Sequence, residues 1–153
     1  MSDMATAELK PRKITIAEYH RMVEAGILDE DERIELLDGV IVEMSPIGQR
    51  HMALHTRIMA YLLDVLGGRA VICGHLSLRL GEFDEPQPDI GIFAPEPDSY
   101  FHRQATVEET YALIEISDSS LQKDIEPKRE LYARFGIGEY LVVDVAGNEL
   151  LHY

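Results

Sequence analysis

The stretch YALIEIS, residues 111–117, decides the fold prediction, because it is apolar on both faces except for one carboxylate. Side chains alternate across a β-strand, so Leu113 and Glu115 point to one face and the residues between them to the other. A strand that is apolar on both faces is typical of the centre of a covered sheet. Burying an unpaired carboxylate costs several kcal/mol, and a metal ion or a lysine near Glu115 would offset that cost. The alternative is a glutamate at a frayed strand end, held by a backbone or arginine contact.

The residues before this strand predict a helix and a hairpin. Residues 15–18, Thr-Ile-Ala-Glu, form a capping-box pattern, and the helical period that follows ends at Gly26. Two apolar runs, 33–37 and 40–44, flank Asp38-Gly39, a dipeptide that suits a type I′ turn because both of its residues need positive φ. The sequence therefore predicts a short helix followed by a β-hairpin.

Helical and extended patterns alternate along the rest of the chain. The expected elements are, in order, a helix over 54–65, strands over 70–73, 76–80 and 89–93, a loop over 94–109, the strand over 111–116, a helix over 124–135 and a strand over 139–144. Pro127 is compatible with the last helix only if it lies in the first turn. This order predicts an α/β protein with a mixed β-sheet flanked by helices. Residues 1–13 are expected to form a flexible tail, and residues 14–153 one domain.

Charge is the observation that fits nucleic-acid binding least. The chain has 14 basic and 28 acidic residues, a net charge of -14, whereas nucleic-acid binders usually carry a basic patch. DNA remains possible as a partner, because bound Mg²⁺ would neutralise carboxylates and a dimer could assemble a basic groove. The arginines available for such a groove are Arg50, Arg57, Arg103, Arg129 and Arg134. The alternative is an acidic surface that keeps the protein soluble.

Composition also indicates the compartment. No stretch approaches the roughly 18 apolar residues of a membrane span, and the N-terminus lacks the apolar core of a signal peptide. The single cysteine, Cys73, lies in an apolar run and is expected to be a small buried hydrophobe. We therefore expect a cytoplasmic protein without a membrane anchor.

Two further residues could act together with Glu115. Asp89 begins an apolar strand directly after Pro88, although an aspartate in that position is often only a turn residue. Lys128 lies on the apolar stripe of its helix, which should turn it toward the sheet, but it could instead pair with Asp124 and extend to solvent. Two carboxylates and a lysine suit phosphodiester hydrolysis, because carboxylates hold Mg²⁺ and lysine neutralises charge on the phosphate.

Other catalytic patterns are weak or missing. His51 and His55 stand one helical turn apart, yet the sequence between them lacks the glutamate of a zinc-protease helix. The sequence has no phosphate-cradling glycine loop and no serine nucleophile elbow. Phosphodiester chemistry therefore remains the best prediction from the residues alone.

Taken in order, several short motifs resemble the Uma-type restriction endonucleases, a bacterial branch of the PD-(D/E)XK nuclease superfamily. These motifs are IELLDG at 34–39, MSP at 44–46 with His51, PQPD at 86–89, LIEIS at 113–117, Asp124 with Lys128, and YARFGI at 132–137 before Glu139-Tyr140. The resemblance runs from about Ile14 to Val145. It implies a restriction-endonuclease-like core.

The resemblance also implies a site. Glu35, Asp89 and Glu115 would bind Mg²⁺ or Mn²⁺, and Asp89, Glu115 and Lys128 would be the catalytic residues. The superfamily's lysine normally stands two residues after the strand glutamate, where this chain has Ser117, so Lys128 matches a lysine relocated to the next helix.

The expected function is that of a metal-dependent endonuclease that hydrolyses the phosphodiester bonds of DNA. The alternative is a catalytically idle nuclease-like scaffold that acts as a protein-interaction or regulatory module, and the acidic composition favours it. A homodimer is expected, because the chain ends at Tyr153 inside an apparent strand, and an exposed terminal strand is a template for pairing.

Overall fold

A computed structural model describes residues 10–118 and 121–153, and for residues 121–124 it describes the backbone only. The elements are α1 (Ile16–Glu24), β1 (Ile34–Leu37), β2 (Val40–Glu43), α2 (Gln49–Leu66), β3 (Val71–Gly74), β4 (Ile90–Phe93), β5 (Thr110–Ser117), α3 (Leu121–Phe135), β6 (Tyr140–Asp144) and β7 (Glu149–His152). Most of the expected tail, residues 1–9, lies outside the described part. None of the described helices is long and apolar enough to cross a membrane.

Five strands form one mixed sheet in the order β3-β4-β5-β6-β7. Strands β5 and β6 are parallel, and the other neighbours are antiparallel. The crossover between the two parallel strands is α3, as a parallel pair requires. The strand quoted first above, β5, is therefore the central strand, as its two apolar faces predict.

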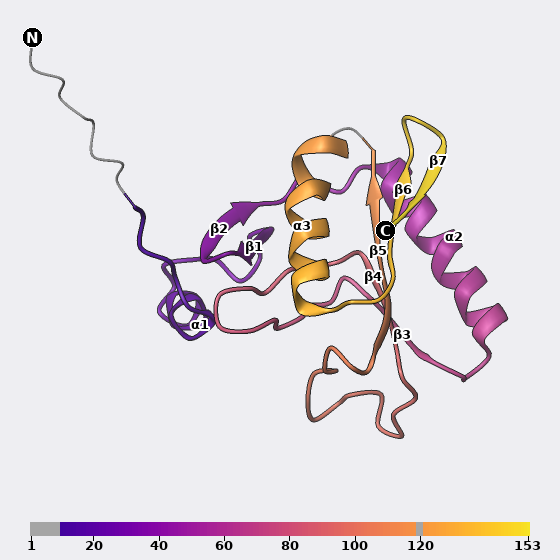
Figure 1. Ribbon diagram of the computed structural model, residues 1–153, viewed down its shortest axis with the longest axis horizontal. Coiled ribbons are helices and arrows are strands. Elements are labelled where there is room, and N and C mark those ends of the chain that lie inside the picture. The colour runs from indigo at the N-terminus through magenta and orange to yellow at the C-terminus, as the bar shows by residue number, and fades with distance from the viewer. Residues whose placement is uncertain (1–9, 119–120) are drawn as a thin grey trace, which may run out of the picture.

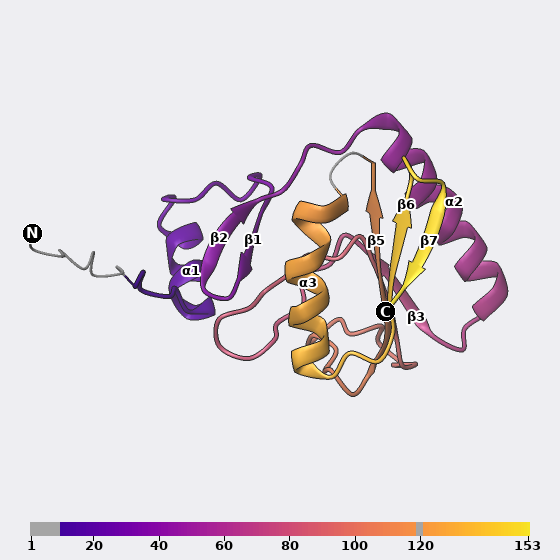
Figure 2. The same ribbon diagram turned by 45° about the horizontal axis from the view of Figure 1, so that its top comes forward.

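Helices cover the sheet on both faces (Figures 1 and 2). In both views α2 and α3 lie on opposite sides of β5 and β6, and the β1-β2 hairpin lies beyond α3. Leu113 of β5 and Val142 of β6 are fully buried in one cluster with Tyr132 of α3. The face of β5 that carries Leu113 and Glu115 is consequently the face that α3 covers.

The N-terminal predictions are confirmed in detail. Thr15 and Glu18 form the reciprocal capping box of α1. Asp38 and Gly39 connect β1 and β2 with φ of 50° and 76°, the positive values that a type I′ turn needs. Both predictions hold because each depends on the chemistry of a few adjacent residues.

Three local predictions are wrong. Residues 76–80 are not a strand, because Leu78 and Leu80 hydrogen-bond back to the carbonyls of Pro86 and Asp84 instead of to a neighbouring strand. Helix α3 begins at Leu121, so Pro127 lies inside it and leaves one carbonyl of the preceding turn without its helical donor. Cys73 is exposed, because β3 is an edge strand that is open on one side.

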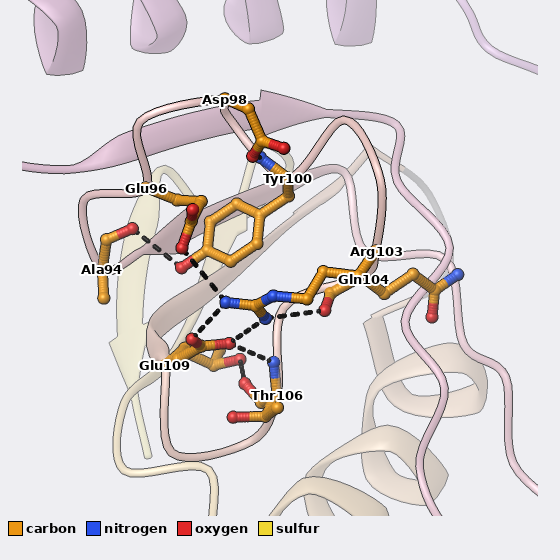
Figure 3. A network of polar contacts seen from close by, with 9 residues as sticks. Ala94, Glu96, Asp98, Tyr100, Arg103, Gln104, Thr106 and Glu109 are labelled. Carbon is orange, nitrogen blue, oxygen red and sulfur yellow. Dashed lines mark hydrogen bonds and ion pairs between the residues drawn. The ribbon is translucent and has the colours of Figure 1, made fainter.

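The long connection between β4 and β5 is held by polar contacts around Arg103 (Figure 3). The Arg103 guanidinium donates to both carboxylate oxygens of Glu109 at 2.7 Å and to Glu96 at 3.1 Å. It also lies over the Tyr100 ring at 5.0 Å. The hydrogen bond from Arg103 lowers the pKa of Glu109 to about 2. Arg103 therefore holds the polar side of this connection, while Tyr100, Ala105 and Val107 pack against the apolar core.

Candidate functional site

Glu115 lies on β5 among buried apolar residues. Only 9% of the residue is exposed, and its neighbours Ile114 and Ile116 are part of the apolar interior. Burial raises the pKa of Glu115 from its ordinary value of 4.5 to about 8, even though the charge of Lys128 opposes the shift. The expectation of an interior carboxylate is thus met, and the residue carries a cost that stability alone does not explain.

Lys128 lies opposite Glu115 on α3. Its ammonium nitrogen is 2.7 Å from Oε1 of Glu115 and 2.9 Å from Oε2 of Glu35, and only 5% of the side chain is exposed. Burial favours the neutral amine, but the two carboxylates prevail and raise the pKa of Lys128. The apolar stripe thus turns the lysine toward the sheet. The alternative partner, the side chain of Asp124, lies outside the described residues.

Glu35 reaches the same lysine from the hairpin. It lies on β1, is 5% exposed, and accepts a hydrogen bond from the backbone N–H of Gln87 at 3.0 Å. Gln87 also donates from its side chain to the carbonyl of Ile34 at 2.9 Å. These two hydrogen bonds, together with the backbone pair between Leu36 and Glu85, attach β1 to the segment that leads into β4. The resemblance alone pointed to Glu35, and the structure brings it to the other site residues.

Asp89 directly precedes β4 and is 4% exposed. The register pairs Ile90 with Ile114, so the next position sets Asp89 opposite Glu115 on the same face of the sheet. Its Oδ2 accepts the backbone N–H of Ile116 at 2.7 Å and lies 3.0 Å from Nε2 of His51. These contacts fix the carboxylate beside the Lys128 pair.

His51 is the residue that sequence reasoning missed. It occupies the first turn of α2, and the next turn carries His55, whose Nε2 is 3.2 Å from the backbone carbonyl of Asp89. His55 in turn stacks on His75 with ring centroids 4.3 Å apart. The spacing of His51 and His55 was visible in the sequence as a shared helix face, but nothing there showed that Asp89 was their partner.

A cavity of about 600 Å³ opens onto these groups and is lined by all four predicted site residues as well as His51. Eight acidic and three basic residues line it, so it favours cations. Its walls come from the hairpin, the first turn of α2, the end of β5 and α3. Segments far apart in the sequence thus meet at one end of the sheet.

The donor set fits a hard divalent cation such as Mg²⁺. Glu35, Asp89 and Glu115 offer carboxylate oxygens, and one lysine can neutralise only one of these three charges. Within residues 10–118 and 121–153, no three such ligands are already gathered around one point. Lys128 lies between Glu35 and Glu115, so a bound cation would share these carboxylates with the ammonium group.

Comparison with known proteins agrees with this geometry. The sequence signature of the Uma2 family, described as "Putative restriction endonuclease", matches residues 16–153. The chain belongs to the Uma2 family. Its expected resemblance to that family and its fold class are thereby confirmed.

A solved structure shares the Uma2 fold seen here. It is the crystal structure of "a putative nuclease belonging to DUF820" from Anabaena variabilis ATCC 29413, which superposes with a TM-score of 0.70 at 19% sequence identity. The match covers 92% of this chain and 79% of that chain. At this identity the likeness concerns the fold. No curated protein matches the chain in sequence.

Proposed function

We propose that this Uma2 protein is an endonuclease that hydrolyses phosphodiester bonds of DNA with the help of Mg²⁺ or Mn²⁺. The observation that carries the proposal is the buried Lys128, whose ammonium group lies within 3 Å of both Glu35 and Glu115 beside Asp89. A buried cluster of three carboxylates and one lysine is costly for folding, so a chemical role explains it better than stability does. Family membership supports the nuclease class.

The residues divide the work as follows. Glu35, Asp89 and Glu115 would hold the divalent cation through oxygen atoms, and His51 keeps Asp89 in place through its contact with Oδ2. The bound ion would polarise the scissile phosphate and lower the pKa of a water molecule. Lys128 stabilises the negative charge that develops on the phosphate, and its two carboxylate contacts fix the position of the ammonium group.

The test is cleavage of supercoiled and linear DNA by the purified protein in Mg²⁺ and in Mn²⁺, with EDTA as the negative control. Single-stranded DNA and RNA are assayed in parallel. Cleavage that requires a divalent ion and disappears in Asp89→Asn supports the proposal. No cleavage of any of these substrates would favour the second candidate, the catalytically idle scaffold.

That second candidate has one specific observation in its favour. The net charge of -14 opposes the approach of a polyanion, whereas it does not oppose a basic protein partner. A scaffold of this kind would retain the fold and could bind metal without cleaving nucleic acid. Metal titration together with cleavage assays therefore separates the two candidates.

We further propose that the protein forms a homodimer in the cytoplasm. The strand β7 lies at the edge of the sheet and pairs only with β6 in the part of the chain that is described, and Leu150 on it is 65% exposed. An edge strand with an exposed apolar side chain is a template for pairing with another chain. A second copy would also add its arginines to those available for a DNA groove.

A further inference from the structure

Three basic residues line the site cavity, and they differ in how they are paired. Lys128 contacts Glu35 and Glu115, as described above. Arg134 donates to the buried Asp84 at 3.1 Å. Arg33 forms no ion pair with any residue in the described ranges. The charge of Arg33 is therefore the one in this cavity that no neighbouring carboxylate within the described residues neutralises directly.

The backbone fixes Arg33 at the cavity wall. Arg33 directly precedes β1, and its carbonyl accepts the N–H of Met44 at 2.8 Å, so it belongs to the base of the hairpin. It stands two residues before Glu35, and alternation along an extended chain puts both side chains on the same face. Both residues line the cavity. An arginine and a carboxylate are thus presented to one space by one strand.

Three buried polar atoms of residues that line this cavity lack hydrogen-bond partners among the described residues. They are Nη1 of Arg33, Nδ1 of His51 and Oδ1 of Asp118, and each is closed to solvent. The Asp118 oxygen has a cation nearby, because it lies 3.3 Å from Nη1 of Arg50. Buried donors of a guanidinium are almost always satisfied in folded proteins, and one that is not requires an explanation.

The ligand that fits is an anion with paired oxygens. The planar fork of a guanidinium matches two oxygens of a phosphate, and such charge-assisted contacts are among the strongest hydrogen bonds in proteins. A protein with a net charge of -14 can bind a polyanion only where local cations face the ligand. We infer that Arg33 binds a phosphate group of the nucleic-acid backbone in the site cavity, which makes it a substrate-binding residue of the proposed nuclease.

This inference rests on the proposed function, and the experiment separates the two. Wild type, Arg33→Gln, Arg33→Lys and the control Arg57→Gln are titrated with inorganic phosphate and with a short fluorescein-labelled DNA duplex. Arg57 is a matched control because it is exposed on α2 and does not line this cavity. Ca²⁺ is present as a hard cation that carboxylates bind. Cleavage in Mg²⁺ is measured separately for all four proteins.

We expect Arg33→Gln to bind both probes about tenfold more weakly than wild type, as loss of a charge-assisted pair implies. The slope of log affinity for the duplex against log salt should fall by about 0.9, the value for one phosphate contact. The affinity of Arg33→Lys for both probes should lie between those of wild type and Arg33→Gln, because lysine keeps the positive charge and loses the planar fork of the guanidinium. Arg57→Gln should retain phosphate binding, and melting temperatures should stay within a few degrees because Arg33 forms no ion pair with the described residues.

Equal binding of both probes by wild type and Arg33→Gln would overturn the inference, as would a wild type that binds neither probe. If Arg33→Gln does not fold, the intermediate affinity of Arg33→Lys decides in its place, and wild-type affinity in that variant overturns the inference. If Arg33→Gln loses phosphate binding but the wild type cleaves no substrate, the phosphate site at Arg33 is retained and the proposed nuclease activity is rejected. If the wild type cleaves DNA and Arg33→Gln binds both probes as wild type does, the nuclease activity is retained and the phosphate site is rejected.

Discussion

Replacing Lys128 by methionine tests the site most directly, because it removes one buried charge and retains most of the stem's packing. The ammonium group is 2.7 Å from Glu115 and 2.9 Å from Glu35, so the variant loses two charge-assisted hydrogen bonds. Removing one partner of a buried pair costs about 3 to 5 kcal/mol when the other charge stays ionised. The raised pKa of Glu115, about 8, lets this carboxyl take up a proton at neutral pH. We therefore expect the lower end, about 3 kcal/mol, or roughly 10 °C in melting temperature.

The effect on catalysis should be at least comparable with the effect on folding. A charge that stabilises the transition state in a buried site contributes a hundredfold or more in rate, about 3 kcal/mol of barrier. Divalent-metal binding should persist, because all three carboxylates remain. The measurements, all at neutral pH, are plasmid nicking in Mg²⁺ and Mn²⁺, calorimetric metal titration and thermal melting. Nicking and titration are carried out below the melting temperature of the variant.

Arg129→Met is the matched control for this experiment. Arg129 is the next residue of α3, but its guanidinium is exposed, contacts Glu126 and does not line the cavity. The control removes one exposed positive charge from the same helix, so it should leave melting nearly unchanged and should lower cleavage far less than Lys128→Met does. Equal cleavage rates for wild type and Lys128→Met would show that Lys128 has no catalytic part. Loss of metal binding in Lys128→Met would show that it acts on the carboxylates and not on the substrate.

The remaining predictions concern pH, the β4-β5 connection and assembly. The free energy of unfolding of the wild type should fall as the pH rises from about 4.5 to about 8, by up to about 1.4 kcal/mol per pH unit, because Glu115 loses its proton at lower pH in the unfolded chain than in the folded protein. Denaturant titrations of Glu115→Gln should lack this pH dependence, and the variant should melt at a higher temperature than wild type above pH 7. Arg103→Ala should make the connection sensitive to limited proteolysis, since Glu109 and Tyr100 lose their common partner. Light scattering at tens of micromolar should give a dimer mass that Leu150→Lys reduces, and a wild-type monomer would contradict the proposed assembly.

The sequence predicted those parts of the fold that depend on period and on local turn chemistry. The capping box at Thr15, the turn at Asp38-Gly39 and the central position of β5 each follow from a few adjacent residues. The strand predicted around Leu78 is wrong because the apolar spacing of this segment resembles a strand, whereas its hydrogen bonds go to the turn at 84–86. A pattern shows that a residue is buried and does not show which segment buries it.

The residues of the candidate site differ in how much of their role the sequence predicted. Lys128 could be derived from the stripe of its own helix, since a position on the apolar face must turn toward the sheet whatever the sheet contains. Glu35 could be reached only through the family resemblance, because its partner Lys128 is distant in the sequence and joins it through packing of α3 against β1. His51 carries only its helical spacing to His55 and its place in the family motif, and the sequence does not show that it contacts Asp89 at 3.0 Å. Arg33 carries no such signal, and only the structure shows that it lines the same cavity.

The position of the lysine explains why the hairpin belongs to the site. With the lysine two residues after the strand glutamate, at Ser117, β5 alone would supply both groups. At Lys128 the ammonium group approaches from α3, and it is then near enough to β1 to pair with Glu35 at 2.9 Å. The hairpin is therefore bound to the core through a charged contact, and the same strand presents Arg33 to the cavity. In this arrangement the hairpin presents two charged groups to the proposed site: Glu35, which pairs with Lys128, and Arg33, which we infer binds the substrate.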